Sequence, residues 1–507
     1  MSTDTETLPT TDDAPRDEGT HSSPVLEPTG DGNGKKVFVE TWGCQMNLLD
    51  TELVLDQLRE KGYGFADKAE DADVVLFNTC SVRDLSEQKV LSKLGRMKYE
   101  KQNGRDVVVG MLGCMAERVG ADVQKKNKAL DLVVGPSELD LLPSMLDDVF
   151  AGDGPQLQLS GHTDRRQKVE ALAKERLETL DRGRYIDPDL AGSKSQAYVR
   201  ITRGCNKFCS FCVVPFTRGE EVHRPPEAII DEVRKLTAAG ALEVTLLGQT
   251  INHYSHGDTS FAELLRRVHD EVPELPRLRF LTSYPRDFTD EALDVMAQSE
   301  RMSRFLHIPV QSGSNSVLKR MNRGYTAEEY FDLIDRARAR MPDVAIVGDM
   351  IVGFPGETDE DFEASLRLLE RVRYKMVYVF KYSPREGTVA YKKLDDDVPV
   401  AVKKERNRRM LELQQKISKE HHDAMVGKVF NVLVEGSAKI DPNKEGGKDA
   451  GGLVQLKGRS DADVVRLTSR TRGDHIVNFD GRHDLVGKLV DVKITRATGL
   501  SLTGELV

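Results

Sequence analysis

The chain has 507 residues, enough for about three domains, and a formal net charge of −10 at pH 7. No stretch approaches the roughly 18 consecutive apolar residues that a membrane-spanning helix needs, so we expect no membrane partner. The first residues lack the apolar core of a secretion signal, and six cysteines in this length fit a reducing cytoplasm, which predicts a cytoplasmic location. Negative charge argues against a nucleic-acid partner, but −7 of it lies in residues 1–34, so the remainder carries only −3.

Residues 1–34 are rich in Thr, Asp, Pro and Gly and contain little that a core would bury, which predicts a disordered acidic tail. Residues 35–154 then alternate short apolar runs with helical patterns. That alternation is typical of a parallel α/β sheet covered on both faces, so we expect the first folded domain here. The predicted strands are 36–41, 73–78, 107–112 and 132–134.

Each of the first three predicted strands is followed directly by a cysteine, namely Cys44, Cys80 or Cys114. The carboxyl ends of parallel strands share one edge of a sheet, and that edge is where ligands bind. A lone buried cysteine is most often structural. Three cysteines at equivalent positions instead favour a site in which three thiolates hold one iron–sulfur cluster.

Residues 155–190 are charged and follow a turn signal, so they are predicted to be a linker. Residues 191–422 contain six strand–helix units. Repeated units of this kind predict an open (β/α)6 partial barrel, whose chemistry takes place at the carboxyl ends of its strands. The predicted strands are 198–202, 243–247, 279–282, 305–310, 344–352 and 376–382.

Cys205, Cys209 and Cys212 follow the first strand of this predicted barrel with the spacing C-x3-C-x2-C. Thiolates suit iron–sulfur clusters or zinc, and a four-iron cluster ordinarily takes four cysteines. A structural zinc site also takes four ligands, and the next histidine, His223, lies outside the usual finger spacing. A disulfide is disfavoured because nothing marks the chain as secreted. The spacing therefore favours a cluster with one open iron.

Polar turns follow the other predicted strands of the barrel. Glycine and proline also mark ordinary turns, so each segment alone is weak evidence, but together they line one mouth. These segments are 248–254, 283–285, 309–314, 353–358 and 382–388.

The C-terminal part changes character twice. Residues 400–422 predict a basic helix, for which a solvated face is the simplest interpretation and contact with RNA phosphates is a hypothesis. Residues 423–500 contain short alternating strands broken by glycine and charged turns, which predict a small antiparallel β-barrel. The segment 441–449 lengthens one of its loops.

The three clustered cysteines, with Phe211 before the last of them, resemble the signature of the radical S-adenosylmethionine (SAM) enzymes. The resemblance implies a 4Fe-4S cluster on Cys205, Cys209 and Cys212, whose open iron is chelated by the amino and carboxylate groups of SAM. It also makes some side chains of the mouth candidates for contact with SAM. Those candidates are Phe211, Gln249 and Gln311.

Segments 41–47, 78–83 and 113–118 are similar to the amino-terminal domain of the methylthiotransferases, a family of radical SAM enzymes. The segment 213–221 fits the tRNA-modifying members, although His223 stands where these usually have a small hydroxyl residue. The resemblance implies a second, auxiliary 4Fe-4S cluster on Cys44, Cys80 and Cys114 that supplies sulfur. It also implies two SAM molecules per turnover, one for the radical and one for the methyl group.

Segments within residues 423–500 resemble the RNA-binding TRAM domain of the same family. The implied reaction is transfer of a methylthio group to C2 of N6-isopentenyladenosine at position 37 of a tRNA anticodon loop. The implied enzyme is a monomer that needs an electron donor such as a flavodoxin or ferredoxin, and a supplier of sulfur or clusters.

Three alternatives stay open at this point. Two are methylthiolation of threonylcarbamoyl-adenosine in tRNA and methylthiolation of a ribosomal-protein aspartate. The third, an iron–sulfur protein that regulates by binding RNA, explains the predicted barrel at the C-terminus but not the polar mouth.

Overall fold

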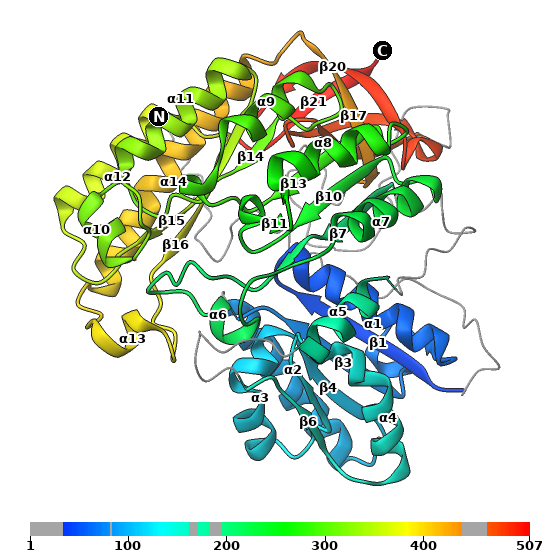
Figure 1. Ribbon diagram of the computed structural model, residues 1–507. Helices are drawn as coiled ribbons and strands as arrows, with labels where there is room; N and C mark the ends of the chain where they lie inside the picture. Colours follow the sequence, from blue (N-terminus) through cyan, green and yellow to red (C-terminus); the bar gives the residue numbers. More distant parts are fainter. Residues whose placement is uncertain (1–33, 82–83, 162–170, 183–194, 439–463) are drawn as a thin grey trace, which may run out of the picture.

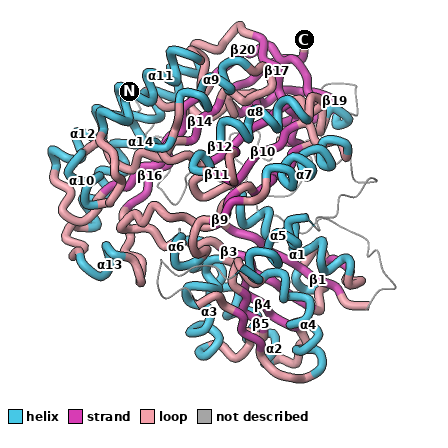
Figure 2. The backbone as a smooth tube through the Cα atoms, in the orientation of Figure 1, coloured by secondary structure: helices cyan, strands magenta, loops and turns pink. Residues whose placement is uncertain are grey.

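The computed structural model describes residues 34–81, 84–161, 171–182, 195–438 and 464–507. The predicted acidic tail and the lengthened loop at 441–449 lie outside these ranges. In the described part, the N-terminal domain and the C-terminal β-barrel lie at opposite ends of the central domain (Figure 1). Helices and strands alternate in the first two domains, whereas strands predominate in the third (Figure 2). No described helix combines the length and the apolar character needed to cross a membrane.

The N-terminal domain is a six-stranded sheet in which every neighbouring pair is parallel, as predicted. Successive side chains of a strand point to opposite faces, so Val37 and Phe38 enter different apolar clusters. Helix α1 covers one face, and α2 and α3 cover the other. In sheet order the strands are β2 (Gly64–Phe65), β1 (Lys36–Trp42), β3 (Val74–Thr79), β4 (Val108–Leu112), β5 (Leu132–Val134) and β6 (Gln156–Gln158). The helices are α1 (Gln45–Glu60), α2 (Asp84–Gln102), α3 (Cys114–Lys126) and α4 (Leu142–Ala151).

The central domain contains the six predicted parallel strands, arranged as two three-stranded sheets. A parallel bridge joins Leu278 of the first sheet to Met302, three residues before the second sheet begins. The first and last strands do not pair in the described structure, so the barrel is open, as predicted. The strands are β7 (Gln196–Arg200), β10 (Glu243–Leu247), β13 (Arg277–Leu281), β14 (Phe305–His307), β15 (Ala345–Val352) and β16 (Met376–Lys381). The main outer helices are α7 (Pro226–Ala238), α8 (Phe261–Glu271), α9 (Asp290–Gln298), α11 (Ala327–Arg340), α12 (Asp359–Val372) and α14 (Val400–Asp423).

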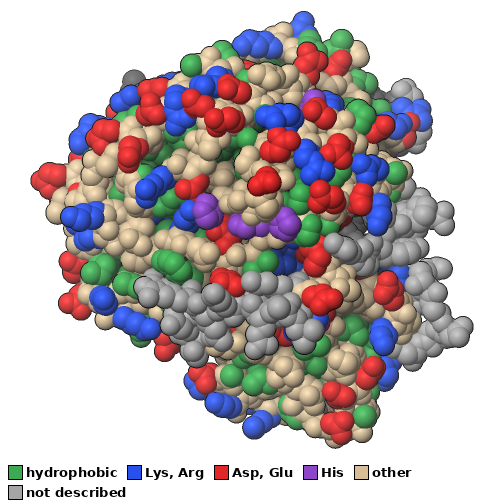
Figure 3. All heavy atoms as spheres, viewed as in Figure 1, with side chains coloured by type: hydrophobic (Ala, Val, Ile, Leu, Met, Phe, Trp, Pro, Cys, Tyr) green, Lys and Arg blue, Asp and Glu red, His purple; other side chains and the backbone are tan. Residues whose placement is uncertain are grey.

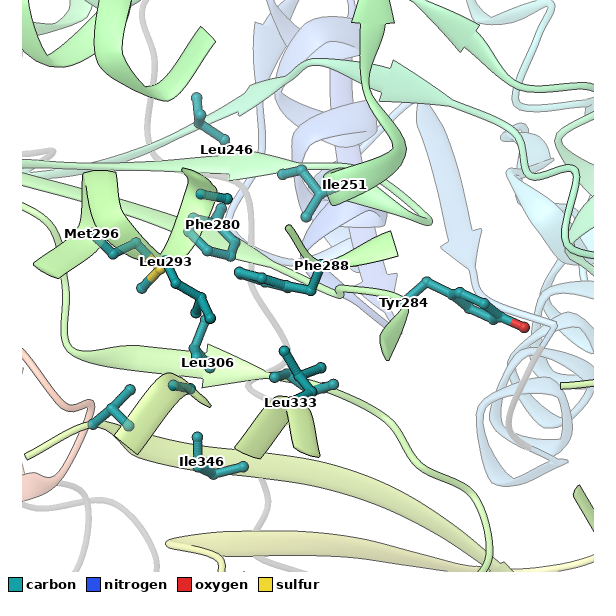
Figure 4. Close-up of a cluster of buried hydrophobic side chains, with 14 of the residues drawn as sticks. Leu246, Ile251, Phe280, Tyr284, Phe288, Leu293, Met296, Leu306, Leu333 and Ile346 are labelled. Atoms are coloured by element: carbon teal, nitrogen blue, oxygen red, sulfur yellow. The ribbon is translucent and has the colours of Figure 1, made fainter. Parts of the chain in front are cut away.

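Apolar side chains from strands and outer helices form the core of the central domain (Figure 4). Phe280 on β13 packs edge-on against Phe261 of α8, with ring centroids 5.1 Å apart, and also contacts Phe288. Leu306 and Leu333 continue this cluster from β14 to α11 (Figure 4). This packing fixes the strands, and therefore the loops at their carboxyl ends.

The C-terminal domain is a closed five-stranded barrel, as predicted, with one parallel pair, β19 with β21, among antiparallel ones. It docks where strands of the central barrel begin: Arg277 donates to the carbonyl of Asn431 at 2.8 Å, and Lys375 pairs with Asp474 at 2.9 Å. It therefore covers the amino-end face of the central barrel. Its strands are β17 (Val429–Ser437), β18 (Val464–Thr471), β19 (Ile476–Arg482), β20 (Leu489–Ala497) and β21 (Leu502–Leu506).

Two segments that the sequence describes as a linker and as a solvated helix interact with the rest of the protein. Within residues 155–190, predicted to be a linker, β6 joins the N-terminal sheet and α5 (Ala171–Arg182) forms a further helix. Basic side chains of α14 pair with acids: Arg406 with Glu357 and Arg409 with Glu363, both at 2.7 Å. These pairs neutralise part of the basic surface for which RNA contact is a hypothesis.

Candidate functional site

The structure brings Cys44, Cys80 and Cys114 to one edge of the N-terminal sheet. Cys44 is the N-cap of α1, and Cys114 is the first residue of α3. Their strands β1, β3 and β4 are neighbours in the sheet. A hydrogen bond with Cys80 lowers the pKa of the Cys44 thiol to about 6, so this pair favours a thiolate.

A glycine and two buried amides set the geometry of this edge. Gly43 has φ of +132°, and a Cβ there would lie 2.5 Å from Cβ of Cys80, so only glycine allows the Cys44 turn to approach so closely. Asn47 lies 3.3 Å from the Cys44 sulfur and donates to Asn78 at 3.1 Å. The start of α1 is thereby held to the end of β3.

The second triad lies on the loop after β8 (Thr202–Arg203), where Cys205, Cys209 and Cys212 have separate polar neighbours. The Cys205 sulfur lies 3.1 Å from the hydroxyl of Thr250, and Arg323 donates to the Cys209 sulfur at 3.2 Å. Burial raises the pKa of Cys205 to about 11 and also raises that of Cys212. Thiols in this state lose their protons when a metal binds, because metal coordination favours the thiolate.

Both triads fit the cluster that each was predicted to hold. All six cysteines are free thiols. Cys44 lies close enough to Cys80 and Cys114, and Cys212 close enough to Cys205 and Cys209, for the thiols of each set to interact. Thiolates are the ordinary protein ligands of iron–sulfur clusters. Three local donors instead of four would leave one iron of a four-iron cluster open.

Arg218 connects the two triads. It lies six residues after Cys212, just beyond the short helix α6 (Val214–Thr217), and donates from Nε to the Cys114 sulfur at 3.2 Å. Its Nη2 pairs with the carboxylate of the buried Asp50 of α1 at 2.7 Å. Six residues span at most about 20 Å of extended chain, so the two sites share one region between the domains.

Asp50 also begins a buried ion network that the sequence did not indicate. It pairs with Arg200 at 2.6 Å, and Arg200 also pairs with Asp181 of α5. Asp181 accepts from Arg203 at 2.9 Å, and these arginines hold its pKa below the usual value. Charged residues spread over 150 positions give no local pattern in the sequence, and only the docked domains bring them together.

The three predicted SAM contacts lie in the barrel loops. Phe211 packs edge-on against Phe354, with centroids 6.4 Å apart. Gln249 precedes Thr250, the neighbour of Cys205, and its Oε1 is buried without a hydrogen-bond partner in the described structure. Gln311 adopts φ of +76° and pairs with Met350 of β15. A strained backbone and an unsatisfied buried amide are features of ligand sites.

An open parallel (β/α)6 barrel with three cysteines after its first strand defines a radical SAM enzyme. Residues 199–369 match the Radical SAM superfamily, and residues 36–135 match a family described as Uncharacterized protein family UPF0004. The radical SAM methyltransferase TsrM from Kitasatospora setae aligns with a TM-score of 0.49 and 16% identity, covering 68% of this chain and 75% of that one. The match to the Radical SAM superfamily implies a 4Fe-4S cluster and SAM.

Relatives with established names extend the match over nearly the whole chain. The tRNA-2-methylthio-N(6)-dimethylallyladenosine synthase of Rhodopirellula baltica is 42% identical over 477 residues, which cover 93% of this chain and 95% of that protein. The synthase of the same name from Thermoanaerobacter sp. (strain X514) is 40% identical over 484 residues, covering 94% of each. The chain therefore belongs to the family of the tRNA-2-methylthio-N(6)-dimethylallyladenosine synthases.

Proposed function

We propose that this protein transfers a methylthio group to C2 of N6-isopentenyladenosine, also called N6-dimethylallyladenosine, at position 37 of tRNA. The connection between the two cysteine triads through Arg218 carries the proposal, because sulfur insertion needs the radical and the sulfur at one carbon atom. The names of the relatives support the choice of substrate.

We assign the two triads different roles. Cys205, Cys209 and Cys212 would hold the cluster that binds SAM, and that cluster would supply the one-electron reduction on which radical chemistry with SAM depends. Cys44, Cys80 and Cys114 hold an auxiliary cluster as the site of sulfur delivery. A second SAM supplies the methyl group. Phe211, Gln249 and Gln311 contact SAM in this proposal.

The protein's own contribution is positioning and charge. Arg323 and Arg218 each place a guanidinium against one cysteine sulfur, which stabilises the negative charge of bound thiolates. The ion network of Asp50, Arg200 and Asp181 holds the N-terminal and central domains in one relative position. Such rigidity matters, because a displacement of about 1 Å at reacting atoms costs roughly 100-fold in rate.

The proposal includes partners outside the chain. The target adenine leaves the anticodon loop to enter the mouth, since proteins usually read RNA bases in single-stranded loops. The C-terminal barrel, similar to a TRAM domain, contacts the same tRNA from the amino-end face. A small electron-transfer protein and a donor of sulfur or clusters complete the cycle, and the enzyme acts as a cytoplasmic monomer.

Mass spectrometry of digested tRNA tests the reaction. A strain without the gene should lose 2-methylthio-N6-isopentenyladenosine and accumulate the nucleoside without the methylthio group. The wild-type gene should restore the product, and genes encoding Cys80→Ala or Cys205→Ala should not. The substrate proposal is wrong if the strain without the gene still contains 2-methylthio-N6-isopentenyladenosine and instead loses methylthiolated threonylcarbamoyl-adenosine or methylthiolated ribosomal-protein aspartate.

A further inference from the structure

Three side chains outside the cysteine triads gather beside the loop of Cys205. Glu221 directly precedes strand β9 (Val222–His223), His223 is the last residue of that strand, and His253 ends the short helix η4 (Ile251–His253). One donor atom from each lies within 4.8 Å of the donor atoms of the other two. Figure 3 shows histidine side chains gathered in a short band on one face of the molecule.

Two donor atoms of this cluster are buried without a partner in the described structure. The Glu221 side chain is only 1% exposed, and while its Oε2 lies 2.7 Å from Nδ1 of His253, its Oε1 has no hydrogen bond. Nδ1 of His223 is buried and unpartnered as well. An unsatisfied buried carboxylate oxygen costs about 1–3 kcal/mol or more, so such an atom points to a missing ligand.

The backbone holds these side chains in place. Strand β9 pairs with β8, with His223 opposite Thr202, and the Glu221 amide donates to Asn206 at 3.2 Å. The His223 ring also packs edge-on against Tyr254, with centroids 5.5 Å apart. One ligand therefore comes from a paired strand and one from the residue just before it, and the third comes from the segment that contains Thr250, the neighbour of Cys205.

We propose that Glu221, His223 and His253 bind a divalent transition-metal ion, and that Zn²⁺ is the occupant. Two imidazoles with one carboxylate form a known three-ligand zinc set that leaves a fourth position open. Calcium and magnesium select oxygen ligands instead. Bonds of about 2.0–2.2 Å place the ligand atoms of a tetrahedral site about 3.4 Å apart, so the cluster must contract through side-chain rotation.

The cluster is also open to solvent on one side. A bound ion would take the place of the hydrogen between Nδ1 of His253 and Oε2 of Glu221, which lie 2.7 Å apart, and the 43% exposed His253 side chain gives the ion a path from solvent.

Such an ion would cross-link two segments that support the radical SAM cysteines. Strand β8 leads into the loop of Cys205, and the segment that carries His253 also carries Thr250, whose hydroxyl contacts Cys205. Zinc is redox-inert, so the ion would exchange no electrons with the neighbouring cluster. The inference does not depend on which substrate the enzyme modifies.

Zinc titration of the full-length protein with its clusters, kept anaerobic, tests the site. Zn²⁺ alone is the probe, its content is measured per chain after dialysis against a zinc buffer, and its ligands are read by X-ray absorption. We expect one equivalent of zinc with only nitrogen and oxygen neighbours at about 2.0–2.2 Å. His223→Ser and His253→Ala should each weaken binding by more than about 100-fold, since loss of mere outer-shell partners costs 10–100-fold.

His256→Ala is the matched control, because this exposed histidine lies close by but outside the set of three. It should retain the full equivalent of zinc. Iron content and thermal midpoint, measured on every variant, separate loss of the site from loss of the fold. The proposal is overturned by absence of a zinc equivalent, by zinc with sulfur neighbours at about 2.3 Å, or by unchanged affinity in folded His223→Ser.

Discussion

Arg218 donates a hydrogen bond to the sulfur of Cys114 at 3.2 Å, although the two residues lie 104 positions apart and in different domains. The same guanidinium pairs with Asp50, which is fully buried. A cysteine predicted to hold the auxiliary cluster is thereby tied to the loop that continues from the radical SAM cysteines. The contact makes the relative position of the two domains part of the site.

Loss of the Arg218 charge should destabilise the docked domains. In Arg218→Met, Asp50 keeps Arg200 but loses one of its two cations, and removal of one partner of a buried ion pair costs about 3–5 kcal/mol. We expect about 3 kcal/mol, seen as a lower urea midpoint of the anaerobic protein. Arg234→Met is the control, because this exposed arginine pairs with Asp231 on the surface and should change stability by less than about 1 kcal/mol. Equal midpoints for the two variants would contradict the importance of the Arg218 contact.

Each cysteine triad should hold one cluster independently. Cys80→Ala and Cys205→Ala should each lose about four irons per chain after anaerobic reconstitution, and the double variant should lose about eight, because cysteine thiolates are the protein ligands of such clusters. Iron and sulfide quantification measures this. If either single variant loses all its iron, or neither loses any, the two-cluster proposal is wrong.

The strands and the positions of the cysteines could be predicted because both depend on local pattern. Apolar runs of β1, β3 and β4 mark buried parallel strands, and the shared edge of such a sheet then brings Cys44, Cys80 and Cys114 together. No long-range information was needed for that step.

The buried charges could not be predicted, because their burial depends on how the domains dock. Asp181 lies in a charged segment that resembles a solvated linker in the sequence, yet its side chain is 3% exposed and pairs with Arg200. His223 and His253 are 30 positions apart, and only the pairing of β8 with β9 and the turn after β10 brings them together. Helix α14 gives a further example: Arg406 and Arg409 pair with Glu357 and Glu363 of another segment, so the sequence of the helix alone does not reveal how much of its charge is neutralised.

Gly204 should be essential for the loop of the radical SAM cysteines. It adopts φ of +72°, and an added Cβ would lie 2.0 Å from the carbonyl oxygen of Glu220. Because that atom belongs to the backbone, Gly204→Ala should displace Cys205 and lose about four irons per chain, while the auxiliary site keeps its iron. Gly257→Ala is the control, with φ of +57° but open space around its Cβ, so it tests left-handed strain alone, about 1–2 kcal/mol. Normal iron content in Gly204→Ala would refute the steric argument.

Acid should weaken the docking of the C-terminal barrel through two buried histidines. His422 on α14 donates from Nδ1 to the carbonyl of Thr498 at 2.7 Å, and its Nε2 lies 3.1 Å from Nδ1 of His475. Burial lowers the pKa of both rings, and the Lys375 cation adds to the effect. The hydrogen bond to Thr498 opposes the shift in the pKa of His422, and Asp474 opposes that of His475. Below about pH 6.5 the folded state therefore binds fewer protons at these histidines than the unfolded chain does.

Stability should then fall as pH drops below about 6.5, by up to about 1.4 kcal/mol per pH unit for each histidine, and these groups should contribute no pH dependence above that value. Urea midpoints between pH 5 and 8 measure the slope. His475→Phe should flatten it, because one of the two titrating rings is gone, whereas His483→Gln, at an exposed position of the same barrel, should leave it unchanged. A slope that survives in His475→Phe would assign the acid sensitivity to other groups of the protein.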